Sequence, residues 1–311
     1  MGGVAPSELV PPPDRRAQVT RGPRGGPGDI ALRLTRAERL LATEGVATAP
    51  LALLVALLRH HQLRAADDSV RAGSLLLAAG VGANLARDRF PLFDLDGLGD
   101  VLLGELDIAV DGLAAPAGDA MPEPLAEAGR GLQAQPAPDR RAVIETWLDD
   151  PSLVDPRMGF WVQAAAMPML EAAAVGAPLP SPEAWRGGAC PLCGGLAQVS
   201  VIAEESGEFM GGSPRSLVCG RCAAWWSFPR AMCALCGESD PRNLASYVAD
   251  GRRWARIDAC ETCHGYVKTF DLREDDAAEV VPLVDDVATL VLDVWALERG
   301  IERTVVSVAG V

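Results

Sequence analysis

Cys190-Pro-Leu-Cys193-Gly194 is the first of four Cys-x-x-Cys pairs in this chain of 311 residues. Two thiolates two residues apart fit one tight turn that points both sulfurs at the same ion, and a second such turn completes a tetrahedron. The glycine after the pair suits a turn that needs a residue without a Cβ atom. The pattern therefore predicts metal ligands, and these are Cys190, Cys193, Cys219, Cys222, Cys233, Cys236, Cys260 and Cys263.

The gaps between the pairs form an internal repeat. A long gap follows the first and the third pair, and a short gap separates the second from the third. Each long gap can hold a β-hairpin that brings two pairs together, so we expect one ion at 190/193/219/222 and another at 233/236/260/263. Four thiolates hold zinc or iron equally well, so the spacing leaves the metal open.

Three roles are open to such sites. In the first, the metals replace a hydrophobic core in units too small to have one, and this is the role we favour. A rubredoxin-like iron electron carrier is the second, and a nucleic-acid-binding zinc ribbon is the third. Residues 181–271 hold nine Lys and Arg against ten Asp and Glu, a balance that lacks the basic surface of nucleic-acid-binding modules.

Composition and charge narrow the class further. Hydrophobic residues make up 49% and charged residues 23% of the chain, as in ordinary globular proteins. A net charge of −14 disfavours binding to nucleic acid or to an anionic membrane. No apolar run is long enough for membrane insertion, and paired cysteines without an export signal indicate metal ligands kept reduced in the cytoplasm. No catalytic motif stands out, so we do not expect an enzyme.

The pattern along the chain predicts an α+β fold. We expect a mostly α-helical N-terminal domain, two tandem rubredoxin-like or zinc-ribbon units, and a C-terminal helix packed on the body. The predicted divisions are a disordered arm at 1–28, the helical domain at 29–178, the first four-cysteine unit at 186–231, the second at 232–272, and the C-terminal helix at 283–300.

Several elements can be placed in more detail. Thr35 is a candidate N-cap for a helix over 35–44, and Asp155-Pro156 begins a helix through 157–175. Asp285-Asp286 is the expected cap of the last helix. Further predictions are a helix over 50–66 that opens with Pro50, an alternating strand at 197–204, and short strands at 224–228, 244–248, 253–257 and 265–270.

The residues around the cysteines resemble those of the formate dehydrogenase accessory protein family, FdhE. The resemblance rests on four motifs that cover about 185–303. They are Cys190-Pro-Leu-Cys193-Gly194, then Cys219-x-x-Cys222-x-x-x-Trp226-x-x-x-Arg230-x-x-Cys233-x-x-Cys236, then Arg256-Ile-Asp-Ala-Cys260-x-x-Cys263-x-x-Tyr266-Val-Lys268-Thr269, and Asp285-Asp286-Val-Ala-Thr289-Leu-Val-Leu-Asp293. Ser227 departs from the histidine expected after the family's tryptophan.

The resemblance implies a cytoplasmic maturation factor that binds the catalytic subunit of a molybdenum- or tungsten-dependent formate dehydrogenase. It also implies rubredoxin-like iron sites, without deciding between iron and zinc, and it leaves open whether the protein forms a homodimer. Aromatic and arginine side chains suit protein contacts. Six residues that frame the cysteines are therefore candidates for partner binding, with a structural role as the alternative: Trp226, Arg230, Tyr266, Lys268, Asp285 and Asp286.

Overall fold

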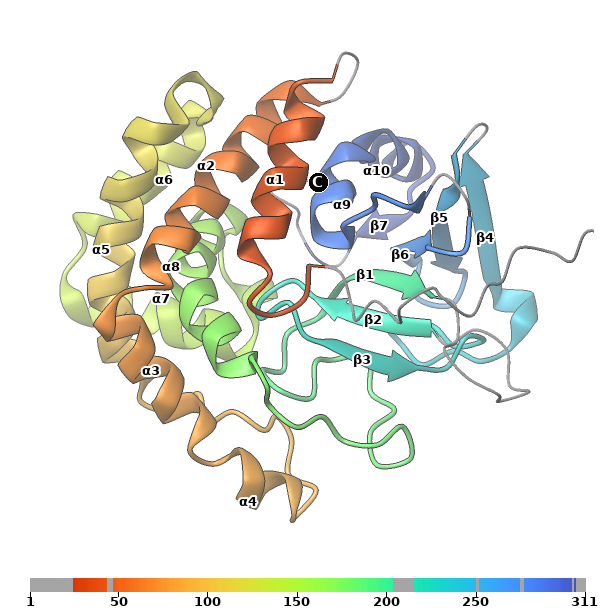
Figure 1. The fold of residues 1–311 in the computed structure, drawn as a ribbon, viewed down its shortest axis with the longest axis horizontal. Helices are drawn as coiled ribbons and strands as arrows, with labels where there is room; N and C mark the ends of the chain where they lie inside the picture. The colour runs from red at the N-terminus through yellow and green to blue at the C-terminus, as the bar shows by residue number, and fades with distance from the viewer. Residues whose placement is uncertain are drawn as a thin grey trace, which may run out of the picture.

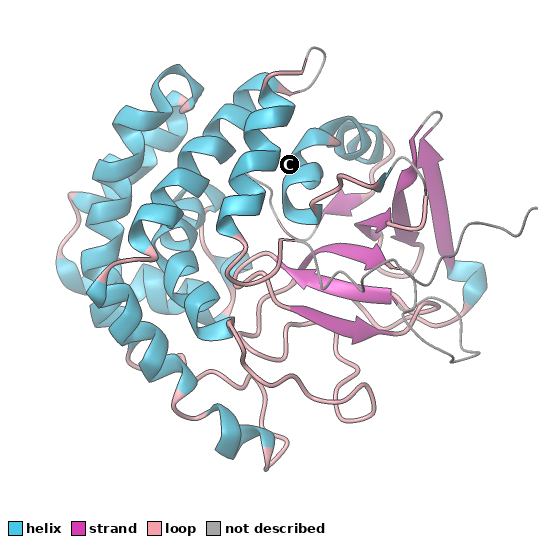
Figure 2. Cartoon of the chain, viewed as in Figure 1, coloured by secondary structure: helices cyan, strands magenta, loops and turns pink. Residues whose placement is uncertain are grey.

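The fold places a group of helices beside a mixed β-sheet, as a computed structural model shows (Figure 1). The structure describes residues 25–43, 47–203, 215–249, 252–274, 277–303 and 305. Eight α-helices precede the first strand among the described residues, and two further helices lie between β6 and β7 in the chain (Figure 2). The predicted α+β class is confirmed. Most of the arm expected at 1–28 lies outside the described residues.

The helical region packs around one long central helix, α8. Helix α8 contacts α3, α5 and α6, and its Trp161 is completely buried. As predicted, Asp155 caps α8, with its carboxylate accepting a hydrogen bond of 2.9 Å from the Arg157 amide. The helices are α1 (Ile30–Leu41), α2 (Thr48–Arg64), α3 (Asp68–Ala78), α4 (Val81–Leu85), α5 (Leu98–Ala117), α6 (Glu123–Gln133), α7 (Ala137–Asp149) and α8 (Pro156–Ala174).

Two predicted helix starts are wrong by a few residues. Helix α1 begins at Ile30, so Thr35 lies inside it and donates its hydroxyl to the Ala31 carbonyl at 2.9 Å. Such bonding one turn back satisfies a threonine within a helix, which is why the residue type alone misled. Helix α2 begins at Thr48, and Pro50 occupies its first turn, where proline removes no helical hydrogen bond.

Both cysteine units contribute to a single seven-stranded sheet. Its order is β3-β2-β1-β6-β5-β4, with β7 paired to β6. Antiparallel hairpins form within each unit, and a parallel pairing of β1 with β6 joins the units, with Val199 opposite Lys268. The strands are β1 (Ala197–Ile202), β2 (Arg215–Cys219), β3 (Trp225–Phe228), β4 (Leu244–Ala249), β5 (Arg252–Cys260), β6 (Gly265–Asp271) and β7 (Glu302–Arg303).

Strand β1 differs from the half-buried strand predicted from its alternating sequence. All six of its residues are buried, including the polar Gln198 and Ser200. Groups inside the protein satisfy both polar side chains: Gln198 donates to the Asp286 carboxylate at 2.7 Å, and the Ser200 hydroxyl accepts from Arg215 at 2.7 Å. The strands predicted at 224–228, 244–248, 253–257 and 265–270 all occur, as β3 to β6, with small shifts at their ends.

The C-terminal helix predicted as one element is two short helices, α9 (Pro282–Ala288) and α10 (Leu290–Leu297). Leu292 and Ala296 of α10 pack against the sheet, whereas Val291, Val294 and Leu297 are exposed. The break at Thr289 rotates α10 relative to α9, so a single helical period could not describe both. None of the described helices is long and apolar enough to cross a membrane.

Candidate metal centres

The first predicted site is assembled as the spacing indicated. The Sγ atoms of Cys190 and Cys222 are 3.7 Å apart, those of Cys193 and Cys219 are 3.5 Å apart, and all four lie within 4.8 Å of one another. Sulfurs bound at about 2.3 Å in a tetrahedron around zinc lie roughly 3.8 Å apart. The cluster therefore has the size that a tetrahedral metal-thiolate centre requires.

The second site has the same geometry. Its Sγ atoms are 3.8 Å apart between Cys233 and Cys263 and 3.7 Å apart between Cys236 and Cys260. All four again lie within 4.8 Å of one another. Both four-cysteine groups predicted from the spacing are thus brought together, and the donor set fits zinc or iron.

Each Cys-x-x-Cys turn ends in a left-handed residue. Gly194 and Gly237 take φ values of 72° and 77°, as their lack of a Cβ allows. Ala223 and His264 occupy the same position in the other two turns and adopt φ of 56° without that freedom. The sequence showed only the glycines. Because this position directly follows the second cysteine, the backbone demand of the turn explains His264 without a ligand role.

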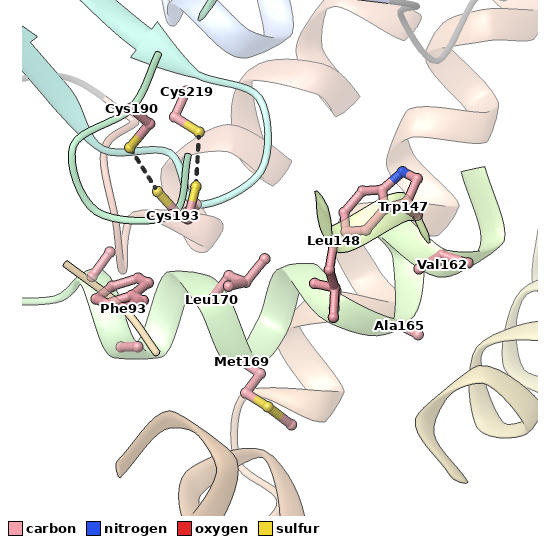
Figure 3. Packing of buried hydrophobic residues seen from close by; sticks show 14 of the residues in the cluster. Phe93, Trp147, Leu148, Val162, Ala165, Met169, Leu170, Cys190, Cys193 and Cys219 are labelled. Carbon is pink, nitrogen blue, oxygen red and sulfur yellow. Dashed lines mark hydrogen bonds between the residues drawn. The ribbon is translucent and has the colours of Figure 1, made fainter. Parts of the chain in front are cut away.

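The first site lies deep in the molecule. Its four cysteines are each at most 1% exposed and belong to the same hydrophobic core as the helical region (Figure 3). The turn of the first pair is tied to the α4–α5 loop by two backbone hydrogen bonds of 2.8 Å, from Leu92 to Pro191 and from Phe93 to Leu192. A metal at this site would therefore hold the helical region and the sheet together.

Arg221 adds a charged link between this site and the helices. It is buried, its amide lies 3.3 Å from the Cys219 sulfur, and its guanidinium stacks 4.2 Å from the Trp147 ring. The same guanidinium donates to the carbonyls of Trp147 and Leu148 at the end of α7. A cation here matches both the negative charge of metal-bound thiolates and the negative end of α7.

The second site is open on one side. Cys233 and Cys260 are buried, whereas Cys236 and Cys263 are exposed. The knuckle of Cys233 is closed by backbone bonds from Cys233 to Glu238 and from Gly237 to Cys233. The two centres thus share one geometry in two environments, one enclosed by the core and the other in contact with solvent.

Burial has a large effect on the pKa values of the free thiols in the first site. Burial raises the pKa of Cys190 and of Cys222 well above the usual value. Burial opposes ionisation of Cys219 too, yet hydrogen bonds from the other three thiols hold its pKa well below the usual value. The thiols alone therefore favour one thiolate over four, and a bound cation supplies the positive charge that four thiolates need.

Five of the six predicted partner-binding residues lie in the interior. Trp226 is 4% exposed and donates its indole N–H to the Gly187 carbonyl at 3.1 Å. Arg230 is exposed. Asp285 is buried, pairs with Arg36 of α1 at 2.7 Å, and accepts a hydrogen bond from the Val281 amide.

Asp285 therefore supports the start of α9 from inside the helix, although it is not the N-cap that we predicted. Burial raises the pKa of Asp285, and the hydrogen bond and charge of Arg36 oppose that shift. Its position links α9 to α1, two helices at opposite ends of the chain.

Tyr266, Lys268 and Asp286 belong to one buried network of ion pairs and hydrogen bonds between β6 and the helices α9 and α10. Lys268 pairs with Asp286 at 2.8 Å and with Asp293 at 2.5 Å, and Tyr266 donates its hydroxyl to Asp293 at 2.7 Å. Arg303 of β7 contacts both carboxylates, at 2.8 Å and 3.0 Å. The family motif contains Asp293, but the sequence did not indicate that it pairs with Lys268, and sequence reasoning missed Arg303 altogether.

The fold and the two sites together define a class. The chain has two tandem four-cysteine groups with the size of tetrahedral metal-thiolate centres; their units share one sheet, and the inner group is built into a helical domain. The sequence model of the family described as "FdhE, C-terminal domain" matches residues 232–309, which include the second site. The predicted resemblance to FdhE is thus confirmed.

Individual relatives agree with the family match. The chain is 34% identical over 118 residues to an FdhE homolog of Aquifex aeolicus, a match that covers 38% of this chain and 40% of that protein. An FdhE homolog of Shewanella oneidensis is also 34% identical over 118 residues, covering 38% and 37% of the two chains. The matched segment thus spans less than half the length of these relatives.

A solved structure extends the likeness to the fold as a whole. The crystal structure of the FdhE protein from Pseudomonas aeruginosa superposes with a TM-score of 0.66, covering 91% of this chain and 96% of that one at 24% identity. The helical region and the sheet of this chain therefore share their arrangement with that structure.

Proposed function

We propose that this protein is a cytoplasmic accessory factor that binds the catalytic subunit of a molybdenum- or tungsten-dependent formate dehydrogenase and is needed for its activity. The observation that carries the proposal is the match of residues 232–309 to the FdhE C-terminal domain. The shared fold over 91% of the chain supports it. In this role the protein acts by binding an immature subunit and performs no catalytic reaction itself.

The two metals, iron or zinc, serve this role by fixing the shape of the binding surface. Four thiolates fill the tetrahedron at each centre, so no coordination position is left for a substrate. The inner site joins the sheet to the helical domain through Cys193 and its neighbours. The outer site, with Cys236 and Cys263 at the surface, shapes the part of the molecule that a partner can reach.

The predicted partner-binding residues then divide into two groups. Arg230 is exposed and follows β3, an edge strand of the sheet, so we assign it direct contact with the client. Trp226, Tyr266, Lys268, Asp285 and Asp286 act from the interior by holding β3, β6 and α9 in place. Ser227 is exposed on β3 where the family has the expected histidine, close to Arg230 in the sequence, and is a candidate for client selectivity.

Deletion of the gene tests the proposal. We expect formate dehydrogenase activity to be lost while its catalytic polypeptide is still made, and the plasmid-borne gene to restore activity. Affinity-tagged protein should capture the catalytic subunit from cells grown with molybdate or tungstate. An Arg230→Glu variant should lose this capture while keeping its metal content, and Arg242→Glu, a change at an exposed arginine elsewhere in the second unit, is the matched control. Normal formate dehydrogenase activity in the deletion strain would contradict the role.

A further inference from the structure

A basic pocket lies on the sheet beside the second metal centre. It has a volume of about 80 Å³, and its walls come from β2, β4, β5, β6 and the segment that leads into the third cysteine pair. Two of the metal-ligating residues, Cys233 and Cys260, form part of its wall. The charged side chains that line it are Arg215, Arg230, Arg256 and Asp258.

Arg215 is the most enclosed of the three arginines. Its side chain is 4% exposed, and it donates from Nε to the Ser200 hydroxyl at 2.7 Å and from one terminal nitrogen to the Met232 carbonyl at 2.9 Å. The other terminal nitrogen lies 3.9 Å from Asp258, beyond hydrogen-bond distance. The guanidinium group of Arg215 is thus held in place by two hydrogen bonds, while its second terminal nitrogen is too far from Asp258 for a third.

Arg256 is held beside the same carboxylate. It donates from Nε to Asp258 at 2.9 Å and is 23% exposed. The other carboxylate contacts of Asp258 are with the hydroxyls of Ser246 and Thr269. The lining of the pocket therefore contains three arginines and, among the described residues, one carboxylate, next to two cysteines of the second metal centre.

The pKa of Arg215 reflects burial and the charged groups around the pocket. Burial lowers its pKa, Asp258 and Cys233 oppose that change, and Arg256 and Arg230 lower the pKa further. The three arginines are therefore close enough to repel one another. An anion between them would remove that repulsion, and planar guanidinium groups bind oxyanions through paired hydrogen bonds.

We propose that this pocket is a binding site for a compact oxyanion, either inorganic phosphate or the phosphate group of a larger ester. Arg256 and Arg230 bind the anion from the more exposed side and Arg215 from the buried side, while the charge of Asp258 weakens the attraction. The site is separate from the four-thiolate coordination of the metal and does not depend on the formate dehydrogenase role.

An alternative use of the arginines makes different predictions. A divalent ion with four thiolates carries two negative charges, and the arginines beside Cys233 and Cys260 could serve to balance that charge alone. In that case their removal weakens metal binding, and phosphate does not bind. The phosphate site instead predicts that removal of Asp258, the only described carboxylate in the lining, strengthens phosphate binding because the pocket then has a larger positive charge.

Calorimetric titration of the full-length, metal-loaded protein with orthophosphate tests the site. We expect saturable binding that weakens with added salt, at least about tenfold weaker binding in Arg256→Gln and in Arg230→Gln, and tighter binding in Asp258→Asn. Arg242→Gln, an exposed arginine outside the pocket, should bind phosphate as the unmodified protein does. Metal content is measured for every variant.

Parallel titrations with pyrophosphate and AMP distinguish the two sources of the anion. Tighter binding of AMP than of orthophosphate assigns the site to a phosphate ester, and equal or weaker binding assigns it to the free ion. Absence of saturable binding by all three probes overturns the proposal. So does a loss of metal in Arg256→Gln accompanied by unchanged phosphate affinity.

Discussion

Lys268 Nζ lies 2.5 Å from Asp293 Oδ2, and both side chains are at most 1% exposed. Asp286 and Arg303 complete a set of two cations and two carboxylates that is neutral as a whole. The set connects β6, α9, α10 and β7. Ion pairs of this kind contribute little net stability when intact, yet each partner depends on the others, because a charge left alone in the interior is costly.

Replacement of Lys268 by methionine should therefore destabilise the protein strongly. The change leaves Asp286 and Asp293 with Arg303 as the remaining cation of the network, and we expect a loss of roughly 3–5 kcal/mol in the free energy of unfolding. Urea unfolding measures it. The control is Arg130→Met, which removes an exposed pair with Glu123 and should cost less than about 1 kcal/mol. Equal effects of the two changes would mean that the network is not the main support of the C-terminal segment.

The two metal centres should lose their ions at different rates. A chelator can approach the exposed Cys236 and Cys263, whereas the first site is enclosed by the core. We expect two phases of metal release, monitored with a coloured chelator, and a fast phase that disappears in Cys236→Ser. Cys193→Ser should instead lower the melting temperature more than Cys236→Ser does, because the first site ties the sheet to the helices. Release in a single phase would contradict this difference.

Arg221 should matter for the attachment of the helical region. Arg221→Met removes hydrogen bonds to the Trp147 and Leu148 carbonyls and the stacking on Trp147. Bonds to charged donors contribute about 1.5–3 kcal/mol each, so a loss of several kcal/mol in unfolding free energy is expected. Arg242→Met, which removes only an exposed contact with Asp240, is the matched control. Hydrogen exchange at the end of α7 should rise in the first variant and not in the second.

His61 should make the protein less stable in mild acid. It is fully buried, and burial, followed by His60 and Arg33, lowers its pKa to about 3, although a weak contact with the Ala164 backbone opposes the shift. The unfolded chain takes up a proton near pH 6.5, whereas the folded protein does not until about pH 3. Stability from this group is complete above pH 6.5 and is lost as the pH falls towards 3.

The size of this effect can be measured by difference. Between pH 7 and pH 5 the histidine should cost about 2 kcal/mol of unfolding free energy. His61→Leu fills the same space with an apolar side chain and removes the titrating group. The unfolding free energy of this variant should therefore fall less between pH 7 and pH 5 than that of the unmodified protein. An identical pH dependence in the two proteins would show that other groups, and not His61, govern the response.

The metal sites could be predicted from the sequence because their geometry is local. A Cys-x-x-Cys turn directs both sulfurs to the same point through local backbone geometry, and the lengths of the gaps indicate which two turns come together. The strands were predictable because each long gap must form a hairpin to bring two turns together. The left-handed backbone at Ala223 and His264 could not be predicted, because alanine and histidine rarely adopt it, whereas glycine, as at Gly194 and Gly237, adopts it readily.

What escaped prediction depends on contacts between distant segments. Arg303 joins the network around Lys268 only because β7 pairs with β6, and Arg36 meets Asp285 only because α1 lies against α9. His61 lies near the end of the leucine-rich helix α2, where a polar side chain can reach water, yet packing buries it completely. Burial of these polar groups is set by the tertiary structure, and a single sequence does not record which charges meet.

The parallel pairing of β1 with β6 bears on how the protein is made. During synthesis the first metal-binding unit leaves the ribosome well before β6, so β1 has an unpaired edge on that side until the second unit has emerged. Exposed strand edges invite pairing with other chains. Early metal capture by Cys190, Cys193, Cys219 and Cys222 would hold the nascent first unit in shape through this interval, and a cell short of metal should accumulate aggregated chains before it accumulates inactive ones.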